Sequence, residues 1–359
     1  MNTANTNNTT NTNNLTKANR ITGLDIYRII ACMLVVINHC NSKVMFQLTP
    51  MTLAWYVTVG VFYVTKIAVP GFLMIAGYNL LHRQDDWTRS FKRALRILVV
   101  MVVFSLLYYV WRSSGEGNFL LGFLNAFWHD NITDAYWYLY MYLGLMLVLP
   151  LLQKLANAMT REDFHVFFVA TLIFVTVIPT ISQFIPGVAF AETFNLPLVM
   201  TYGGCVAYMF FGHYFYKYGF KYPVWWPVVG FVCGFAMNMV ISVMEFRATG
   251  GADYLSVGEI EYIPLMLESI SMFAFLMWIE NNRGYASVIV KSARFIAPQT
   301  FGIYLVSDFL CAETHFIYFN LCPYMNRLLA VAIEDVVVLA VGFIFVLAIR
   351  KIPVVAKYL

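Results

Sequence analysis

The amino-acid sequence predicts an all-α, polytopic membrane protein, a bundle of about ten transmembrane helices, and three observations support this prediction. Hydrophobic residues make up 60% of the 359 residues and charged residues only 12%, whereas soluble domains carry roughly a quarter charged residues. Apolar runs long enough to cross a hydrocarbon core, about 20 residues each, recur along the chain. Lysine and arginine gather on one side of these runs.

Each apolar run is expected to form one helix that crosses the lipid bilayer. In chain order the ten runs are residues 22–41, 55–81, 94–111, 136–152, 164–184, 198–216, 224–244, 261–279, 295–315 and 328–349.

The charges between the runs test this division. With a cytoplasmic N-terminus, 17 of the 23 lysines and arginines fall on the inner side, four on the outer side, and Arg28 and Lys66 within runs. Every loop then obeys the positive-inside rule, which a missed or invented span would break. We therefore predict that both termini are cytoplasmic.

The chain divides into three parts. Residues 1–20 begin with the tract MNTANTNNTTNTNNL, which has almost nothing to bury and is predicted to form a disordered cytoplasmic tail. Residues 21–353 form the ten-helix domain, and 354–359 a short cytoplasmic tail.

The net charge of +4 does not indicate nucleic-acid binding. In a membrane protein the positions of lysine and arginine report the orientation of the spans, and their total number does not indicate a partner. The six cysteines show no C-x-x-C spacing, so we expect neither a metal site nor a disulfide framework.

The first run, LDIYRIIACMLVVINHC, carries Arg28 and His39 among apolar residues. Their separation of 11 positions places both on one helix face, about 16 Å apart along the axis. Asp25 lies one turn before Arg28 and is placed to pair with it. One interpretation is that both residues snorkel to the two membrane surfaces. The other is that they line one path at two depths, because ionisable residues inside a membrane are functional by default.

The depth of each other buried charge in the membrane follows from the number of residues between it and the end of its run, because an α-helix rises about 1.5 Å per residue. The outer half holds imidazole and carboxylates: His39, Glu268, Asp308, Glu334 and Asp335. An imidazole there suits proton abstraction from an alcohol, and a neighbouring carboxylate would fix its tautomer.

The inner half and inner rim hold arginines: Arg28, Arg93 and Arg96. Guanidinium groups pair bidentately with phosphate, and a helix N-terminus, where Arg93 and Arg96 lie, favours anions further. The inner end is therefore predicted to bind an anionic, phosphate-bearing ligand, unless these arginines are only topology signals.

Six segments in order resemble the membrane-bound acyltransferase 3 family. Arg28 and His39 fit the basic residue, ten intervening positions and histidine of its first span. The other segments are KIAVPGFLMIAGYNLL (66–81), FKRALRIL, WYLYMYLGLMLVLPLL (137–152), YMFFGHYF (208–215) and FGIYLVSDFL (301–310).

The resemblance implies a ten-helix domain of the bacterial cytoplasmic membrane. It would pass an acyl group, usually acetyl from cytoplasmic acetyl-CoA, to a hydroxyl of an envelope carbohydrate or glycolipid. The family's functional assignments carry over to Arg28, His39, Arg93 and Arg96. Many members have histidine where this chain has Ser307, so a second ionisable group is lost there or Asp308 replaces it.

Together these inferences assign a role to each candidate. Arg93 and Arg96, helped by Arg28, would bind the phosphates of CoA. His39 would act as general base on the acceptor hydroxyl or as a transient acyl carrier.

The remaining candidates would support this chemistry. Glu268 or Asp308 would orient the imidazole of His39. Lys66 would stabilise negative charge on the thioester oxygen, or pair with one of the carboxylates.

A transporter or flippase for a small polar solute is the alternative function, because charges along a path would also serve a solute that crosses unmodified. A cationic inner mouth combined with a single deeply embedded histidine suits CoA better than a neutral solute. The inverted halves typical of many transporters are not visible in the sequence.

Overall fold

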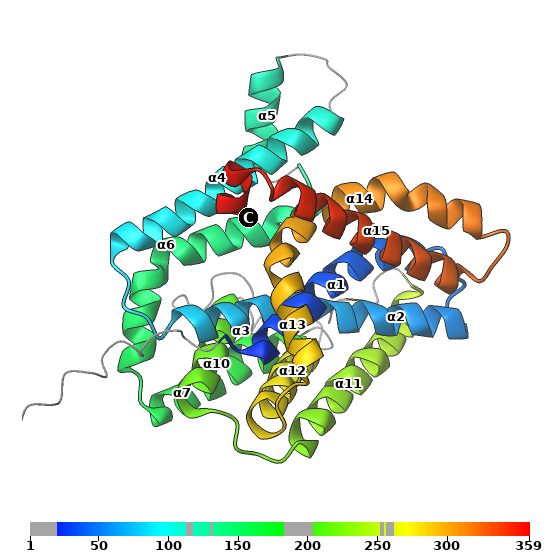
Figure 1. The fold of residues 1–359 in the computed structure, drawn as a ribbon. Coiled ribbons are helices and arrows are strands. Elements are labelled where there is room, and N and C mark those ends of the chain that lie inside the picture. Colours follow the sequence, from blue (N-terminus) through cyan, green and yellow to red (C-terminus); the bar gives the residue numbers. More distant parts are fainter. Residues whose placement is uncertain (1–19, 113–117, 130–131, 183–203, 252–254, 256–261) are drawn as a thin grey trace, which may run out of the picture.

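The computed structural model describes residues 20–112, 118–129, 132–182, 204–251, 255 and 262–359, and those residues form helices and connecting turns without strands. Figure 1 shows α1 (Thr22–Met45) running through the middle of the bundle. It packs against α2 (Leu53–Lys66), α3 (Ala68–Leu80), α12 (Ile263–Asn282), α13 (Ser287–Ile296), α14 (Thr300–Leu321) and α15 (Arg327–Ile349). The helix that carries Arg28 and His39 is thus surrounded by other helices along its length.

Eight helical stretches in the described part of the chain are long and apolar enough to cross a membrane, and each overlaps a predicted run. Besides α1, α12 and α15 they are α2 with α3, α4 (Trp87–Arg112), η1 (Asp134–Tyr136) with α6 (Trp137–Ala158), α11 (Trp225–Thr249), and α13 with η4 (Ala297–Gln299) and α14. The described residues are therefore all-helical, as predicted, and hold eight candidate membrane-spanning helices, as expected of a multi-pass membrane protein.

The other two predicted runs adjoin residues outside the described part. The run 164–184 corresponds to contiguous helix from α7 (Arg161–Ala170) through a π-helical turn (Thr171–Val177) to α8 (Ile178–Ser182). The run 198–216 corresponds to α10 (Cys205–Tyr218). Since residues 183–203 are not described, the count of ten spans stays a prediction, as does the cytoplasmic location of both termini. The N-terminal tract 1–19 also lies outside the described residues.

Two short helices were not predicted. α5 (Phe119–Trp128) lies where the sequence predicted an outer loop, and it extends from the top of the bundle in Figure 1. α16 (Pro353–Tyr358) includes most of the predicted C-terminal tail and packs against α4.

Local chemistry explains where the central helices begin and break. Glu280 of α12 accepts hydrogen bonds from the backbone of Gly23 (2.7 Å) and Thr22 (3.3 Å), which satisfies amides that an α-helix N-terminus leaves unpaired. The second span divides at Ile67 into α2 and α3, because Pro70 has no amide hydrogen to continue the helical ladder.

Close backbone contact joins α3 to α10. A Cβ atom at Gly77 would overlap the carbonyl of Met209, and one at Gly212 would overlap that of Met74. Only glycine permits this approach at both crossings. The contact fixes α3, whose other side faces the cavity described below.

Candidate active site

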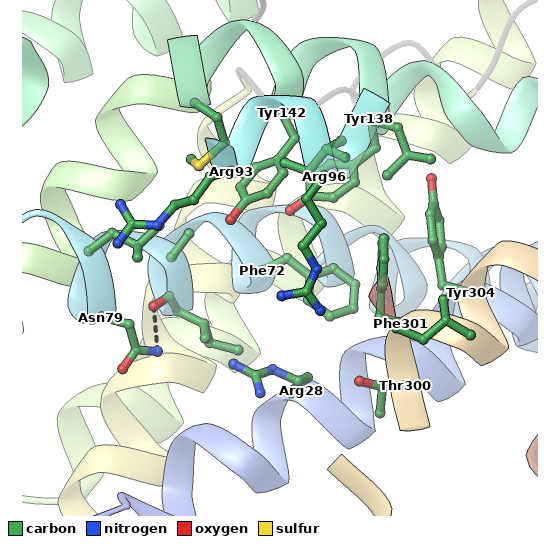
Figure 2. A pocket seen from close by; sticks show the side chains of 17 residues that line it. Arg28, Phe72, Asn79, Arg93, Arg96, Tyr138, Tyr142, Thr300, Phe301 and Tyr304 are labelled. Carbon is green, nitrogen blue, oxygen red and sulfur yellow. Dashed lines mark hydrogen bonds between the residues drawn. The ribbon is translucent and has the colours of Figure 1, made fainter. Parts of the chain in front are cut away.

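A cavity of about 430 Å³ opens between α1, α3, α4, α6 and α14, and three arginines line it. We call it the arginine cavity. Arg28 enters it from α1, and Arg93 and Arg96 enter from α4. Figure 2 shows Arg28 and Arg96 reaching into the space from opposite walls. The structure thus brings together the three arginines that the sequence placed at the inner end.

Arg93 is fixed by Asp85, which precedes α4. Arg93 Nη1 contacts Asp85 Oδ2 and Nη2 lies 3.4 Å from Oδ1. Gln153 of α6 donates to the same carboxylate at 2.8 Å and accepts from the Asp85 amide at 2.9 Å. Burial opposes ionisation of the carboxyl, but the hydrogen bonds from Arg93 and Gln153 outweigh it and hold the pKa of Asp85 below its usual range. Sequence reasoning missed Asp85, because a carboxylate between two spans resembles any loop residue.

Arg28 and Arg96 are held more loosely. Arg28 Nη1 lies 3.9 Å from Asp25 Oδ1, while Asp25 Oδ2 accepts a hydrogen bond from Arg20. Arg96 Nε donates to the backbone carbonyl of Tyr358 at 3.0 Å. The expected pairing of Asp25 with Arg28 is therefore shared with Arg20, and the side chain of Arg28 remains 35% exposed.

Aromatic rings form one wall of the arginine cavity. Tyr138 and Tyr142 stack with centroids 5.6 Å apart, and Tyr138 also contacts Phe72 at 6.0 Å and Tyr304 at 6.2 Å. All four residues line the cavity (Figure 2). Tyr304 lies one helical turn before Asp308 on α14, and Asp308 is not among the residues that line the cavity.

His39 and Asp308 meet outside the arginine cavity, one helical turn past Tyr304 along α14. His39 Nδ1 lies 3.6 Å from Asp308 Oδ1, and Asp308 Oδ2 accepts a hydrogen bond from Thr133 Oγ1 at 2.6 Å. We call these three residues the histidine site. The side chains of His39 and Asp308 are 19% and 29% exposed, so the site is accessible. Because Nδ1 faces the carboxylate, Nε2 is the ring nitrogen left to meet a substrate.

Neighbouring positions complete the comparison with the expected site. Ser307 is buried and donates to the carbonyl of Tyr304 at 2.8 Å, so its hydroxyl is used within its own helix. Asp308, not Ser307, is the residue of this pair that faces His39. Thr133 was missed by sequence reasoning, since a single threonine before a span carries no periodic signal.

Lys66 lies near the histidine site and not in the arginine cavity. It ends α2, and its Nζ lies 4.5 Å from the centroid of the Phe62 ring. The preceding residue, Thr65, donates a hydrogen bond to Asn38, the residue before His39, at 3.0 Å. Lys66 is not among the residues that line the arginine cavity.

Glu268 is placed elsewhere. Its Oε1 accepts a hydrogen bond from Asn238 Nδ2 at 2.5 Å, and both side chains are fully buried between α11 and α12. Glu334 pairs with His315 at 3.1 Å. Of the carboxylates that the sequence put at the outer depth, Asp308 is the one whose ion-pair contact with His39 is observed among the described residues.

Metal-ligating residues do not gather in the described residues: none of their histidines, cysteines and acidic residues form a group of three that could hold a metal ion. The six cysteines are free thiols.

Comparison with known proteins identifies the family. No curated protein and no solved structure gives a significant match to this chain. The sequence profile of the acyltransferase 3 family, described as an acyltransferase domain, matches residues 21–350. That range holds Arg28, Arg93 and Arg96 of the arginine cavity and all of the histidine site. The chain therefore belongs to the acyltransferase 3 family of membrane acyltransferases.

Proposed function

We propose that the protein is a transmembrane O-acyltransferase of the bacterial cytoplasmic membrane. It would move an acyl group, most simply acetyl, from cytoplasmic acyl-CoA to a hydroxyl of an envelope carbohydrate or glycolipid. One observation supports this above the others: α1 carries an arginine in the arginine cavity and a histidine in the histidine site. The two centres are about 16 Å apart along that helix.

The arginine cavity suits the CoA end of the donor. Its volume of about 430 Å³ falls within the range of small-molecule pockets, about 300–1,000 Å³. Guanidinium groups bind phosphate oxygens bidentately and remain charged when desolvated. The aromatic wall would contact the uncharged pantetheine arm, so that the thioester points toward the histidine site.

The histidine site suits the transfer step. His39 Nε2 would take the proton of the acceptor hydroxyl while its oxygen attacks the thioester carbonyl carbon. The carbon–sulfur bond then breaks, and the departing CoA sulfur receives the proton from the imidazolium. Asp308 would stabilise that imidazolium and hold its Nδ1–H. The ammonium of Lys66 would stabilise negative charge developing on the carbonyl oxygen.

Turnover of acetyl-CoA tests this function. Purified protein in proteoliposomes is given acetyl-CoA and mixed envelope glycans, and the release of free CoA thiol is followed for the native protein, His39→Ala and Arg93→Ala. We expect His39→Ala to abolish release, because the base is lost. Arg93→Ala should release thiol again at higher acetyl-CoA concentration, because only donor binding is weakened.

Equal background release by the native protein and His39→Ala would contradict the proposal. The alternative function, transport of a small polar solute along the same charges, would then be measured directly as solute uptake into the same vesicles.

A further inference from the structure

Residues 132–136, just before α6, lie against α14 and are tied to it and to α4 by hydrogen bonds. Arg112 of α4 donates to the carbonyl of Ile132 at 2.9 Å. Tyr304 of α14 donates to the carbonyl of Ala135, and Tyr136 donates to the carbonyl of Leu305 at 2.7 Å. Buried tyrosine hydroxyls thus hold this segment at a fixed height along α14.

Two of the hydrogen bonds to α14 involve the residues on either side of Asp308 along the helix. The carbonyl of Leu305 and the amide of Phe309 are the two partners of one α-helical rung. Tyr136 donates to the carbonyl, and the Phe309 amide donates to the hydroxyl of Tyr108 at 2.7 Å. Both backbone groups are therefore bound from outside the helix, from α4 and from the 132–136 segment, next to the residue that faces His39.

Thr133 provides the contact to the Asp308 side chain itself. Thr133 is 2% exposed. Its hydroxyl accepts a hydrogen bond from the Ala135 amide at 3.4 Å and donates one to Asp308 Oδ2 at 2.6 Å. With Oδ2 held in this way, Oδ1 is the oxygen that faces His39 Nδ1. Each carboxylate oxygen thus faces its own partner, and the hydrogen bond from Thr133 holds the Oδ2 side of the group.

We propose that Thr133 is a positioning residue for acyl transfer, which holds Asp308 so that the His39 imidazole keeps its proton on Nδ1 and presents Nε2 to the acceptor. This proposal rests on the proposed function. The side chain of Asp308 is 29% exposed, so without the Thr133 hydroxyl it can rotate toward solvent. A misplaced orienting group slows the reaction without weakening donor binding, because Thr133, Asp308 and His39 are not among the residues that line the arginine cavity.

Two threonine variants test the role of the hydroxyl. Thr133→Val keeps the shape and removes the donor, and Thr133→Ser keeps the donor. Thr171→Val is the matched control, because Thr171 Oγ1 is buried without a hydrogen-bond partner among the described residues. We expect Thr133→Val to lower kcat by about ten- to a hundredfold, as misplacement of a reacting group does, with the KM for acetyl-CoA unchanged. Thr133→Ser and Thr171→Val should keep the native kcat.

A second readout does not depend on turnover. Nitrogen-15 spectra of histidine-labelled protein in detergent report which ring nitrogen of His39 carries the proton, with the signal assigned by its loss in His39→Gln. We expect the Nδ1–H form in the native protein and Thr133→Ser, and a mixture of forms in Thr133→Val and Asp308→Asn. Tyr136→Phe removes the hydrogen bond to Leu305 but keeps the ring, and it should also give a mixture of the two forms. This variant replaces Thr133→Val in the test if Thr133→Val does not fold.

The two readouts separate the possible failures. Native kcat and native tautomer in Thr133→Val would overturn the positioning role, as would equal damage by Thr133→Ser. If the native protein transfers no acyl group, the proposed function fails, while the spectra still decide whether Thr133 sets the state of His39.

Discussion

At the scale of single residues, the two centres are built differently. Arg93 is clamped by a carboxylate, whereas Arg28 and Arg96 have looser contacts and are free to adjust to a ligand. His39 faces a carboxylate that is itself held by Thr133. The sequence predicted Arg28 and His39 because charge inside an apolar run is conspicuous, and Arg93 and Arg96 because they lie together at a helix N-terminus. It did not predict Asp85 or Thr133, because polar residues between spans are expected everywhere.

The pH dependence of stability should reveal the clamp on Asp85. Its pKa is lowered in the folded protein, so its stabilising contribution is fully present above the unfolded value of about 3.9 and is lost as the pH falls through the folded value. Asp85→Asn should therefore lower the unfolding temperature at pH 7. It should also make the unfolding temperature decrease less steeply as the pH is lowered below about 4. Thermal unfolding in detergent from pH 7 to pH 3 measures both.

Asp86→Asn is the matched control for this prediction. Asp86 is exposed, and its side chain accepts a hydrogen bond from the Arg89 amide at 3.0 Å. Asp86→Asn should therefore leave the dependence of the unfolding temperature on pH close to that of the native protein. An Asp85→Asn protein with the native profile would show that the clamp adds nothing to stability.

At the scale of helices, the hydrophobic runs predicted eight of the spans that the structure describes. They did not predict α5 or the division at Ile67, because a ten-residue apolar helix and a proline break both look like parts of loops or longer runs. Nor could they predict which helices touch. Counting helical rise put Glu268 at the depth of His39, but helix pairing placed it against α11 instead.

Glu268 is therefore expected to join α11 to α12 and to take no part in the chemistry. Glu268→Ala leaves the Asn238 amide buried without its acceptor, which should cost about 1–3 kcal/mol in the free energy of unfolding. Glu268→Gln keeps an acceptor oxygen at Oε1 and should fold and turn over acetyl-CoA like the native protein. Thermal unfolding and thiol release measure the two effects. Loss of turnover in a folded Glu268→Gln protein would restore the catalytic role that the sequence suggested.

At the scale of the whole molecule, the chain has two chemically different ends joined by one central helix. The arginine cavity is cationic and backed by aromatic rings, and the histidine site combines imidazole with carboxylate. The excess of lysine and arginine on one side of the spans predicts that the arginine cavity faces the cytoplasm. An acyl group that enters at the cavity and leaves at the histidine site would then cross the membrane.

The most direct test of this account is a sided transfer measurement. Protein is reconstituted in one orientation, radiolabelled acetyl-CoA is added only on the side of the arginine cavity, and a glycan acceptor is supplied only on the other side. The account predicts label on the acceptor with the native protein and none with His39→Ala. Transfer that occurs only when donor and acceptor share one side would contradict it.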